Sequence, residues 1–292
     1  MLVHLVDGTY ELFRYHFALP SHETADGREV AAARGVLGSV IQLLEDGATH
    51  IGVATDHVIT SFRNDLWDDY KDGEGTEPVL LQQFPLVEEL LVAAGFCVWP
   101  MVEYEADDAL AAAAAHAAEW DDVDRVLICT PDKDLAQCVR EDGKVAQFDR
   151  RKGQLYDADG VREKFGVSPE SIPDYLGLVG DSADGFPGLA GWGAKSASTV
   201  LAEYTHIEQV PAAADDWTCT VRGAGKLAAT LQSNLELALL FRRIATVELD
   251  SVPQLQPTDV EWTGPLDGFG ELCAQVDAQS AFERIERLLA QR

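Results

Sequence analysis

The sequence is poor in basic residues and in cysteine, and it contains no long hydrophobic run. Of its 292 residues, 22 are Lys or Arg and 50 are Asp or Glu, so the formal net charge is −28. Residues 109–118 form an apolar stretch that is too short for a membrane-spanning helix and includes a histidine. The five cysteines are scattered without a CxxC pair, which favours reduced thiols over disulfides or a zinc site. The first residues lack a basic segment, so we expect no signal peptide and a cytoplasmic location.

The shortage of basic charge argues against nucleic acid as a partner. Proteins that bind phosphates usually carry a basic surface, and this chain as a whole does not. The simplest explanation of the excess acid is a solvated surface that keeps the protein soluble. The positions of individual carboxylates therefore matter more than their number.

Three short apolar runs each end close to an aspartate. Residues 2–6 precede Asp7, residues 50–55 precede Asp56, and residues 126–130 precede both Asp132 and Asp134. Short runs rich in Val and Ile and separated by helical stretches are typical of buried strands in a parallel sheet. Binding sites of such sheets form beyond the carboxyl ends of the strands, where these aspartates lie. The intervening helices are predicted over 30–45, 85–94 and 106–120.

The second part of the chain, from residue 168 onward, has a different pattern. It predicts helices over 169–179, 194–203 and 225–245, with a closing helix near 280–290 and a Gly-rich loop at 185–193. The sequence therefore predicts an α/β part over 1–167, a parallel sheet flanked by helices, and a helical part over 168–292.

Nine carboxylates are predicted at one edge of the sheet. Each has a simpler explanation, because acids stabilise the first turn of a helix and aspartates cap helices or form turns. Gathered together they would repel one another unless cations neutralised them. Oxygen ligands without Cys or His favour Mg²⁺ or Mn²⁺, and two such ions about 4 Å apart promote phosphodiester displacement. The nine are Asp7, Asp56, Glu105, Asp107, Asp108, Asp132, Asp134, Asp181 and Asp184.

The Gly-rich loop is a second candidate site. It is not a Walker A loop, because Ala194 separates Gly193 from Lys195. A helix, a Gly-rich turn and a second helix fit a backbone-amide cradle for a duplex phosphate, assisted by Lys195. A tight turn between helices is the competing interpretation, and it stays open. The candidate DNA-binding residues are Gly188, Gly191, Gly193, Lys195 and Ser196.

Most of the chain resembles a known family, the 5′-nuclease domain of bacterial DNA polymerase I and its stand-alone relatives. The resemblance implies a PIN-like nuclease core over 1–167 with an arch segment at about 57–84. It implies a helix–three-turn–helix (helix-hairpin-helix-like) DNA-binding subdomain over 168–292. No polymerase follows, so we expect the stand-alone form. The matching segments are 5–20, 49–56, 61–71, 104–114, 129–139, 178–197 and 221–247.

The resemblance also implies roles for residues. One cation is expected near Asp7, Asp56, Glu105 and Asp107, another near Asp132, Asp134, Asp181 and Asp184, with Asp108 beside both groups. Two or more Mg²⁺ or Mn²⁺ ions are the expected cofactors, and a K⁺ ion at the Gly-rich loop is a further candidate. The expected catalytic basic residues are Arg14, Arg63 and Lys71, and Lys71 would contact the scissile phosphate.

The sequence departs from the family pattern at the arch. Relatives carry an arginine three residues after the lysine, where this chain has Glu74, and the segment 68–77 is acidic. Gly185 stands where the family usually has Asn.

The main hypothesis is a structure-selective 5′-nuclease of DNA replication and repair. Its partner would be DNA with a duplex and a free 5′ end or flap, or an RNA–DNA hybrid, and no membrane. The alternative is a non-catalytic or weakly catalytic module that binds branched DNA and has a degraded arch. A Ca²⁺ buffer is disfavoured, because the sequence has no EF-hand loop.

Overall fold

The computed structural model describes residues 1–291, which fold into two compact units. Unit 1 consists of Met1–Ile59, Gly73–Thr130 and the described residues from Leu249 onward, and unit 2 of Thr60–Asp72 and Pro131–Glu248. Each unit therefore combines segments that are distant in the sequence. The predicted division at residue 167 stays a prediction.

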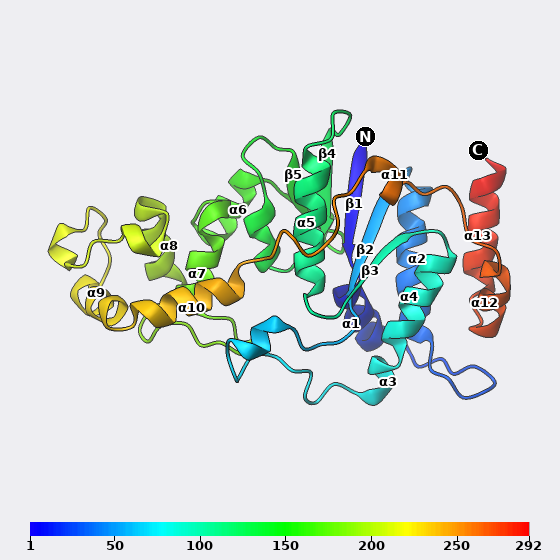
Figure 1. Ribbon diagram of the computed structural model, residues 1–292, viewed down its shortest axis with the longest axis horizontal. Coiled ribbons are helices and arrows are strands. Elements are labelled where there is room, and N and C mark those ends of the chain that lie inside the picture. The colour runs from blue at the N-terminus through cyan, green and yellow to red at the C-terminus, as the bar shows by residue number, and fades with distance from the viewer. Residues whose placement is uncertain (292) are drawn as a thin grey trace. The chain divides into compact units, whose positions relative to one another are not determined.

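Unit 1 contains four parallel strands in the order β3-β2-β1-β4 (Figure 1). Strand β1 is buried from Val3 to Asp7, and both of its neighbours are parallel, so apolar residues occupy both faces without alternation. Strand β3 was not predicted; it contains Pro100, which an edge strand tolerates. The bounds are β1 Leu2–Asp7, β2 His50–Asp56, β3 Cys97–Met101 and β4 Arg125–Cys129.

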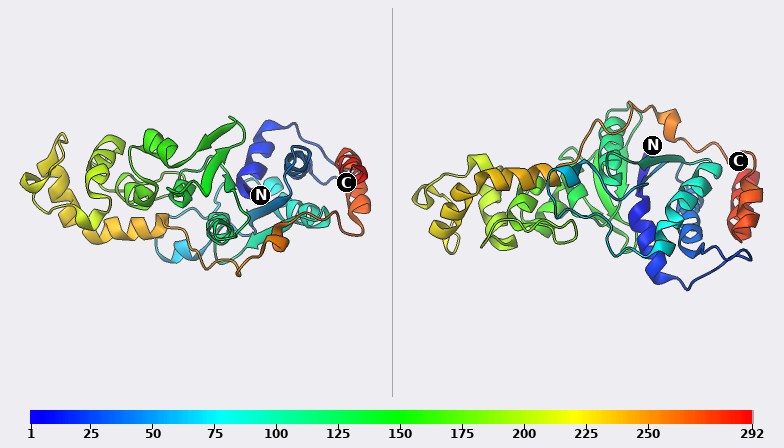
Figure 2. Two further views of the ribbon diagram at one scale, coloured as in Figure 1. Left: turned by 90° about the horizontal axis from the view of Figure 1, so that it is seen from above. Right: turned by 60° about the horizontal axis from the view of Figure 1, so that its bottom comes forward.

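Helices flank the strands of unit 1. Helices α1, α2 and α4 contact one another, and α5 packs on the strands. The C-terminal helices, red in Figures 1 and 2, lie beside the blue helix α2 and against α4. The bounds are α1 Gly8–Ala18, α2 Ala31–Glu45, α3 Pro78–Leu81, α4 Gln83–Ala93, α5 Ala106–Ala118, α11 Pro257–Val260, α12 Phe269–Gln275 and α13 Gln279–Ala290.

Unit 2 is mainly helical and has a hydrophobic core of its own. The Phe186 and Phe241 rings stack at a centroid distance of 5.6 Å, and Trp67 meets Phe241 edge-on at 5.0 Å. A short antiparallel pair, β5–β6, was not predicted. The bounds are β5 Val145–Asp149, β6 Gln154–Tyr156, α6 Ala158–Phe165, α7 Ile172–Val179, α8 Ala194–Tyr204, α9 Ala224–Ser233 and α10 Leu235–Ala245, with 3-10 turns at Phe62–Asp65, Asp134–Cys138, Pro169–Ser171, Ile207–Gln209 and Ala214–Asp216.

The α/β class with a helical second part is confirmed, as are the helices predicted over 30–45, 85–94, 106–120 and near 280–290. The single helix predicted over 225–245 is wrong. Asn234 has φ −132° and ψ 29°, outside the helical region, and divides the segment into α9 and α10. Within residues 1–291 no helix combines the length and apolarity needed to cross a membrane, and none of the five cysteines forms a disulfide.

A buried carboxylate ties together the helices of unit 2. The Asp174 side chain, on α7, is 2 % exposed. Its Oδ1 accepts hydrogen bonds from the Arg242 Nη1 of α10 and the Ile207 backbone N–H, each at 3.0 Å. Its Oδ2 lies 3.0 Å from the His206 Nδ1. Because a buried charge needs a partner, this ion pair fixes α10 against α7.

Replacing Asp174 by Ala leaves the Arg242 guanidinium without its buried partner. We expect the free energy of unfolding to fall by about 3–5 kcal/mol. The matched control is Glu208→Ala, which removes the exposed partner of the same arginine and should cost about 0–1 kcal/mol. Urea unfolding measures both, and equal losses in the two variants would contradict a special role for Asp174.

Candidate functional site

Two predicted acids lie at the carboxyl ends of neighbouring strands in unit 1. The Asp7 Oδ1 accepts a hydrogen bond from the Tyr10 N–H at 2.8 Å and so caps α1. Its Oδ2 accepts one from the Thr130 hydroxyl at 2.9 Å. The Asp56 Oδ1 accepts from the Ala106 N–H at 2.7 Å, which ties the end of β2 to the start of α5. In the structure, Asp7, Asp56 and the start of α5 therefore lie at one edge of the sheet.

The acids at the start of α5 have structural duties as well. The Glu105 backbone N–H donates to the Asp108 Oδ2 at 2.9 Å, and the Asp108 side chain is completely buried. This is a capping box, so helix capping accounts for Asp108. Asp107 lies in the first turn and is half-buried. The assignment of a metal to the five acids of unit 1 stays a prediction.

Unit 2 gathers three of its four predicted acids tightly. Carboxylate oxygens of Asp134, Asp181 and Asp184 all lie within 4.8 Å of one another, an arrangement that no other three His, Cys, Asp or Glu side chains share in the described part of the chain. We call these three residues the acid cluster. The fourth acid, Asp132, is exposed, and its Oδ1 accepts a hydrogen bond from the Asp134 N–H at 3.0 Å. Asp132 therefore orients the cluster.

A tight turn places two cluster residues side by side. The Asp181 N–H donates to the Phe186 carbonyl at 2.8 Å, and the Phe186 N–H donates back to the Asp181 carbonyl at 3.0 Å. Gly180 and Gly185 have positive φ angles of 85° and 86°, which glycine adopts without strain. The two hydrogen bonds thus close a short loop between residues 181 and 186, and this loop carries both Asp181 and Asp184.

The cluster is strongly unfavourable for ionised carboxylates. Burial, followed by the charges of Asp132, Asp184 and Asp181, raises the pKa of Asp134 well above its usual 3.8. Burial also raises the pKa of Asp184, although Lys71 opposes the shift. The buried Asp134 Oδ1 has no hydrogen-bond partner. Three oxygen donors and an orphaned buried oxygen fit a hard divalent cation.

Two lysines face the cluster. The Lys71 Nζ lies 3.0 Å from the Asp184 Oδ1, and the Lys133 Nζ forms an ion pair with the Asp181 Oδ2. Lys71 was predicted as a site residue and Lys133 was not. Its position in the sequence between Asp132 and Asp134 was the available signal. Burial alone would lower the pKa of Lys133, but its hydrogen bond to Asp181 and the neighbouring charges raise it.

Both predicted catalytic arginines form hydrogen bonds or ion pairs with other residues of the protein. The Arg63 side chain is 3 % exposed, and it donates to the Ile244 carbonyl at 2.8 Å and the Thr246 carbonyl at 3.1 Å. Arg63 therefore satisfies carbonyls at the end of α10 in unit 2. In unit 1, Arg14 pairs with Glu11 at 2.5 Å. Catalytic roles for these arginines stay predictions beside these structural ones.

Part of the predicted arch segment packs within unit 2. Its portion from Thr60 to Asp72 belongs to unit 2, where the Trp67 Nε1 donates to the Gly185 carbonyl at 3.2 Å and the Lys71 N–H to the Asp184 carbonyl at 3.0 Å. A Cβ on Gly185 would lie 2.0 Å from the Asp69 carbonyl oxygen. Glycine at 185 therefore permits the close approach that brings Lys71 to the cluster. The acids Asp68, Asp69, Asp72, Glu74 and Glu77 are exposed.

The Gly-rich loop borders a cavity of about 670 Å³ in unit 2. Lys195 and Ser196 line it together with Arg222, which the sequence interpretation missed. The signal for Arg222 was a second Gly-rich stretch, residues 222–226, at the start of α9. The Gly193 N–H donates to the Ser196 hydroxyl at 3.0 Å, which caps α8.

The loop glycines have different requirements. Gly188 has a φ of 67°, and a Cβ there would lie 2.4 Å from the Gly180 nitrogen. Gly191 also has a positive φ but open space around it. Gly193 is extended, with φ −147° and ψ 172°, which any residue adopts. The conformational need for glycine therefore falls on Gly188 and Gly191.

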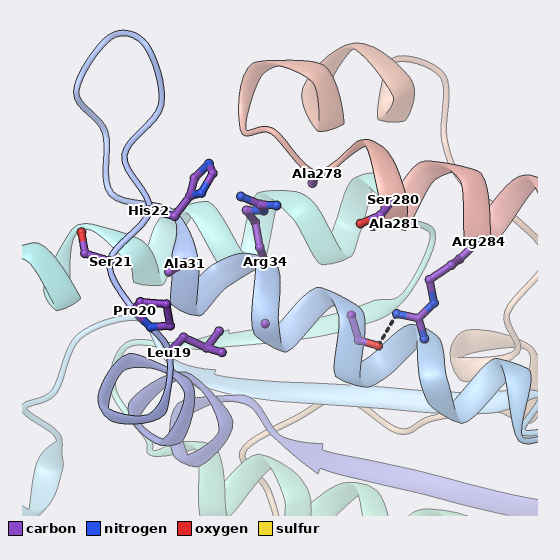
Figure 3. Close-up of a pocket in the computed structure, with 12 residues that line it drawn as sticks. Leu19, Pro20, Ser21, His22, Ala31, Arg34, Ala278, Ser280, Ala281 and Arg284 are labelled. Atoms are coloured by element: carbon purple, nitrogen blue, oxygen red, sulfur yellow. Dashed lines mark hydrogen bonds between the residues drawn. The ribbon is translucent and has the colours of Figure 1, made fainter.

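A separate pocket of about 300 Å³ lies in unit 1 (Figure 3). Residues 19–22, α2 and α13 line it, and Arg284 donates a hydrogen bond across it to the Gly38 carbonyl at 3.0 Å. None of the predicted site residues is among its lining residues. It is therefore distinct from both candidate sites.

Without divalent cations, Asp134→Asn should stabilise the protein. When folding raises the pKa of a carboxyl, that group adds fully to the free energy of unfolding at pH values below its pKa in the unfolded chain. The contribution is lost as the pH rises through the raised pKa of the folded state. We therefore expect the variant to be more stable at neutral pH in EDTA by about 1–3 kcal/mol, with a difference that vanishes below about pH 3.8. Thermal unfolding against pH measures this.

The control is Asp149→Asn, another buried aspartate of unit 2. Burial alone would raise its pKa, but hydrogen bonds from Lys152 lower it. Its stabilising contribution is present above the unfolded pKa and is lost as the pH falls through the folded one, so this variant should be less stable at neutral pH. The same sign for both variants would contradict the electrostatic account of the cluster.

Comparisons with known proteins identify the family of the chain. The 5′-3′ exonuclease N-terminal resolvase-like domain matches residues 2–166, and the 5′-3′ exonuclease C-terminal SAM fold matches residues 167–267. The chain is 33% identical over 289 residues to DNA polymerase I of Bacillus caldotenax, covering 97% of this chain and 32% of that protein. It thus spans about a third of the length of this relative.

A shorter relative and a solved structure complete the comparison. A 5′-3′ exonuclease of Aquifex aeolicus is 33% identical over 210 residues, 71% of each chain. A bacteriophage T5 flap endonuclease, solved in a complex with DNA and metal ions, superposes with a TM-score of 0.64 at 20% identity, covering 99% of this chain and 98% of that one. At this identity the superposition establishes the fold alone. On the domain matches and the Aquifex relative, the chain belongs to the 5′-3′ exonuclease family.

Proposed function

We propose that this protein is a structure-selective 5′-nuclease that hydrolyses phosphodiester bonds at or near 5′ ends of DNA during replication and repair. The acid cluster of Asp134, Asp181 and Asp184 carries the proposal, because three carboxylates within 4.8 Å of one another, two of them buried, need cations to be ionised together. Family membership supports the same activity, since the Aquifex relative is named a 5′-3′ exonuclease.

The cations proposed are Mg²⁺ or Mn²⁺. The donors at the acid cluster are carboxylate oxygens, which these ions prefer. A second cation is proposed at Asp7, Asp56, Glu105 and Asp107, the acids at the strand ends of unit 1, and a K⁺ ion at the Gly-rich loop. When bound, such divalent ions activate water and stabilise the charge that develops on the phosphate.

Lys71 is the side chain best placed to contact the phosphate. Its ammonium lies at the acid cluster, is 30% exposed and can donate to a phosphate oxygen. The Lys71 N–H bond to the Asp184 carbonyl fixes the backbone beneath it. Because the lysine starts from a fixed position, little conformational entropy is lost when it binds the substrate.

The Gly-rich loop is proposed to hold duplex DNA. Lys195 and Arg222 are both exposed, and they line one cavity with the start of α8. Helix N-termini and basic side chains bind phosphate without reading the base sequence. The loop would therefore recognise duplex structure, in DNA or in an RNA–DNA hybrid.

The acidic segment limits which 5′ ends this nuclease would favour. Asp68, Asp69, Asp72, Glu74 and Glu77 are exposed, and they repel the phosphates of a long single strand. We therefore propose a preference for recessed or nicked 5′ ends over long flaps.

Cleavage of 5′-labelled flap and nicked duplexes with Mn²⁺ or Mg²⁺ tests the proposal. The wild-type protein should cleave both. Asp184→Ala and Lys71→Ala should each reduce kcat by a factor on the order of 10² or more, because each removes charge stabilisation at the phosphate. Asp142→Ala removes an equally charged but exposed aspartate of unit 2 and should leave the rate unchanged. Binding of branched DNA without cleavage under either cation would instead support the non-catalytic alternative.

The loop assignment has a separate test in the salt dependence of DNA binding. Lys195→Ala should weaken duplex binding equally for all sequences and lower the slope of log K against log salt by about one phosphate contact. Lys152→Ala, which removes an exposed lysine of the same unit, is the matched control. If the slope is the same in the Lys195 variant as in the wild type, the loop is only a turn between helices.

A further inference from the structure

The Asp181 carboxylate is engaged on both of its oxygens. Its Oδ1 accepts a hydrogen bond from the Ala183 N–H at 2.9 Å, and its Oδ2 forms the ion pair with Lys133. The Asp181 side chain is only 4% exposed, so little solvent reaches either oxygen. A divalent cation that binds Asp181 therefore meets the Lys133 ammonium at the same carboxylate.

The cluster is unevenly neutralised. Asp181 has Lys133 and Asp184 has Lys71, whereas the buried Asp134 Oδ1 has no hydrogen-bond partner. With Asp132, whose charge also acts on Asp134 and Asp184, four carboxylates face two ammonium groups. A divalent cation bound to Asp181 would lie close to the Lys133 ammonium, and the two positive charges would repel strongly because little water screens them at this buried carboxylate. Movement of that ammonium into solvent removes the repulsion.

Lys133 is the lysine that competes with a cation for Asp181, because it pairs with that carboxylate. Lys71 pairs instead with the Asp184 Oδ1. Lys133 follows the exposed Asp132, and its own side chain is 35% exposed, so solvent is open to the ammonium once it moves.

We infer that Lys133 is an internal counter-ion that occupies the cation site in the ion-free protein and is displaced from Asp181 when a divalent cation binds. Lys133 then sets the affinity of the acid cluster for its cation, while it stabilises the cluster in the absence of the ion. The inference rests on the proposed cation site and is independent of nuclease activity.

Mn²⁺ binding to Lys133→Met tests the inference without any turnover. Mn²⁺ binding is first measured by calorimetry on the wild type and on Asp134→Asn. The binding step that is present in the wild type and absent from the variant belongs to the acid cluster. For that step we expect Lys133→Met to bind Mn²⁺ about tenfold more tightly or better, because the competing charge is gone. The same variant should unfold at a lower temperature in EDTA and gain more on addition of Mn²⁺.

Two control variants separate competition from a purely structural role. Lys133→Arg keeps the positive charge and should retain an affinity near that of the wild type. Lys152→Met removes the ion pair with the buried Asp149 of the same unit and should lower stability without changing Mn²⁺ affinity. Unchanged or weaker Mn²⁺ binding by Lys133→Met overturns the inference.

A measurement on the wild-type protein covers the case in which Lys133→Met fails to fold. On titration with Mg²⁺, the lysine ε-methylene NMR signal that is absent from Lys133→Arg should shift, and that of Lys152 should not. A Lys133 signal that stays fixed while Mg²⁺ binds also overturns the inference. Absence of any binding step that depends on Asp134 would instead remove the proposed cation site itself.

Discussion

Mutual repulsion among closely placed carboxylates is the electrostatic constraint around which the acid cluster is built. Asp134, Asp181 and Asp184 come from a 3-10 turn and a closed loop, and each element is fixed by backbone hydrogen bonds that leave the side chains little freedom to separate. The lysines, the glycines and the docked segment before Lys71 all serve this arrangement. Gly185 admits that segment, and the segment delivers the ammonium group that faces Asp184. A strained group of charges persists only where its surroundings hold it, and such places are typical of functional sites.

The large negative charge and a phosphate substrate are compatible because they act over different distances. A charge of −28 spread over the surface opposes the approach of DNA at long range, and salt screens it within about 10 Å. The groups proposed to bind phosphate are few and local: backbone N–H groups, Lys71, Lys195 and Arg222. Composition reports the first effect and is silent on the second, so it does not exclude the proposed phosphate substrate.

The sequence predicted the elements whose signal is local. Strands β1, β2 and β4 are runs of Val, Ile and Leu, and α2 and α5 are long apolar-periodic or alanine-rich stretches. It missed β3, because Pro100 breaks the usual strand composition, and β5–β6, because each is short and half-polar. The break at Asn234 was also invisible, since leucines and alanines continue on both sides of it.

The candidate site was predictable only in part. Aspartates after strands and before glycines carry a clear signal, and the structure gathers three of them in unit 2. The burial of Arg63 under the carbonyls of residues 244 and 246, and the pairing of Lys133 with Asp181, depend on contacts between residues more than 45 positions apart. No spacing rule contains such contacts. Gly185 is the instructive case, because its departure from the family pattern has a steric reason that only the Asp69 carbonyl supplies.

The interleaving of the two units has a consequence for how the chain is made. Thr60–Asp72 leaves the ribosome long before Pro131–Glu248, the segment with which it packs, and unit 1 receives α12 and α13 last. During synthesis, Arg63 is therefore made before the carbonyl groups of residues 244 and 246 to which it later donates hydrogen bonds. Helix α2 is likewise made before α13, which packs against it. Unit 2 can be completed only after residue 248 has been translated, and unit 1 only after its last segment follows, so the order of synthesis disfavours complete folding of an N-terminal half before the rest of the chain is made.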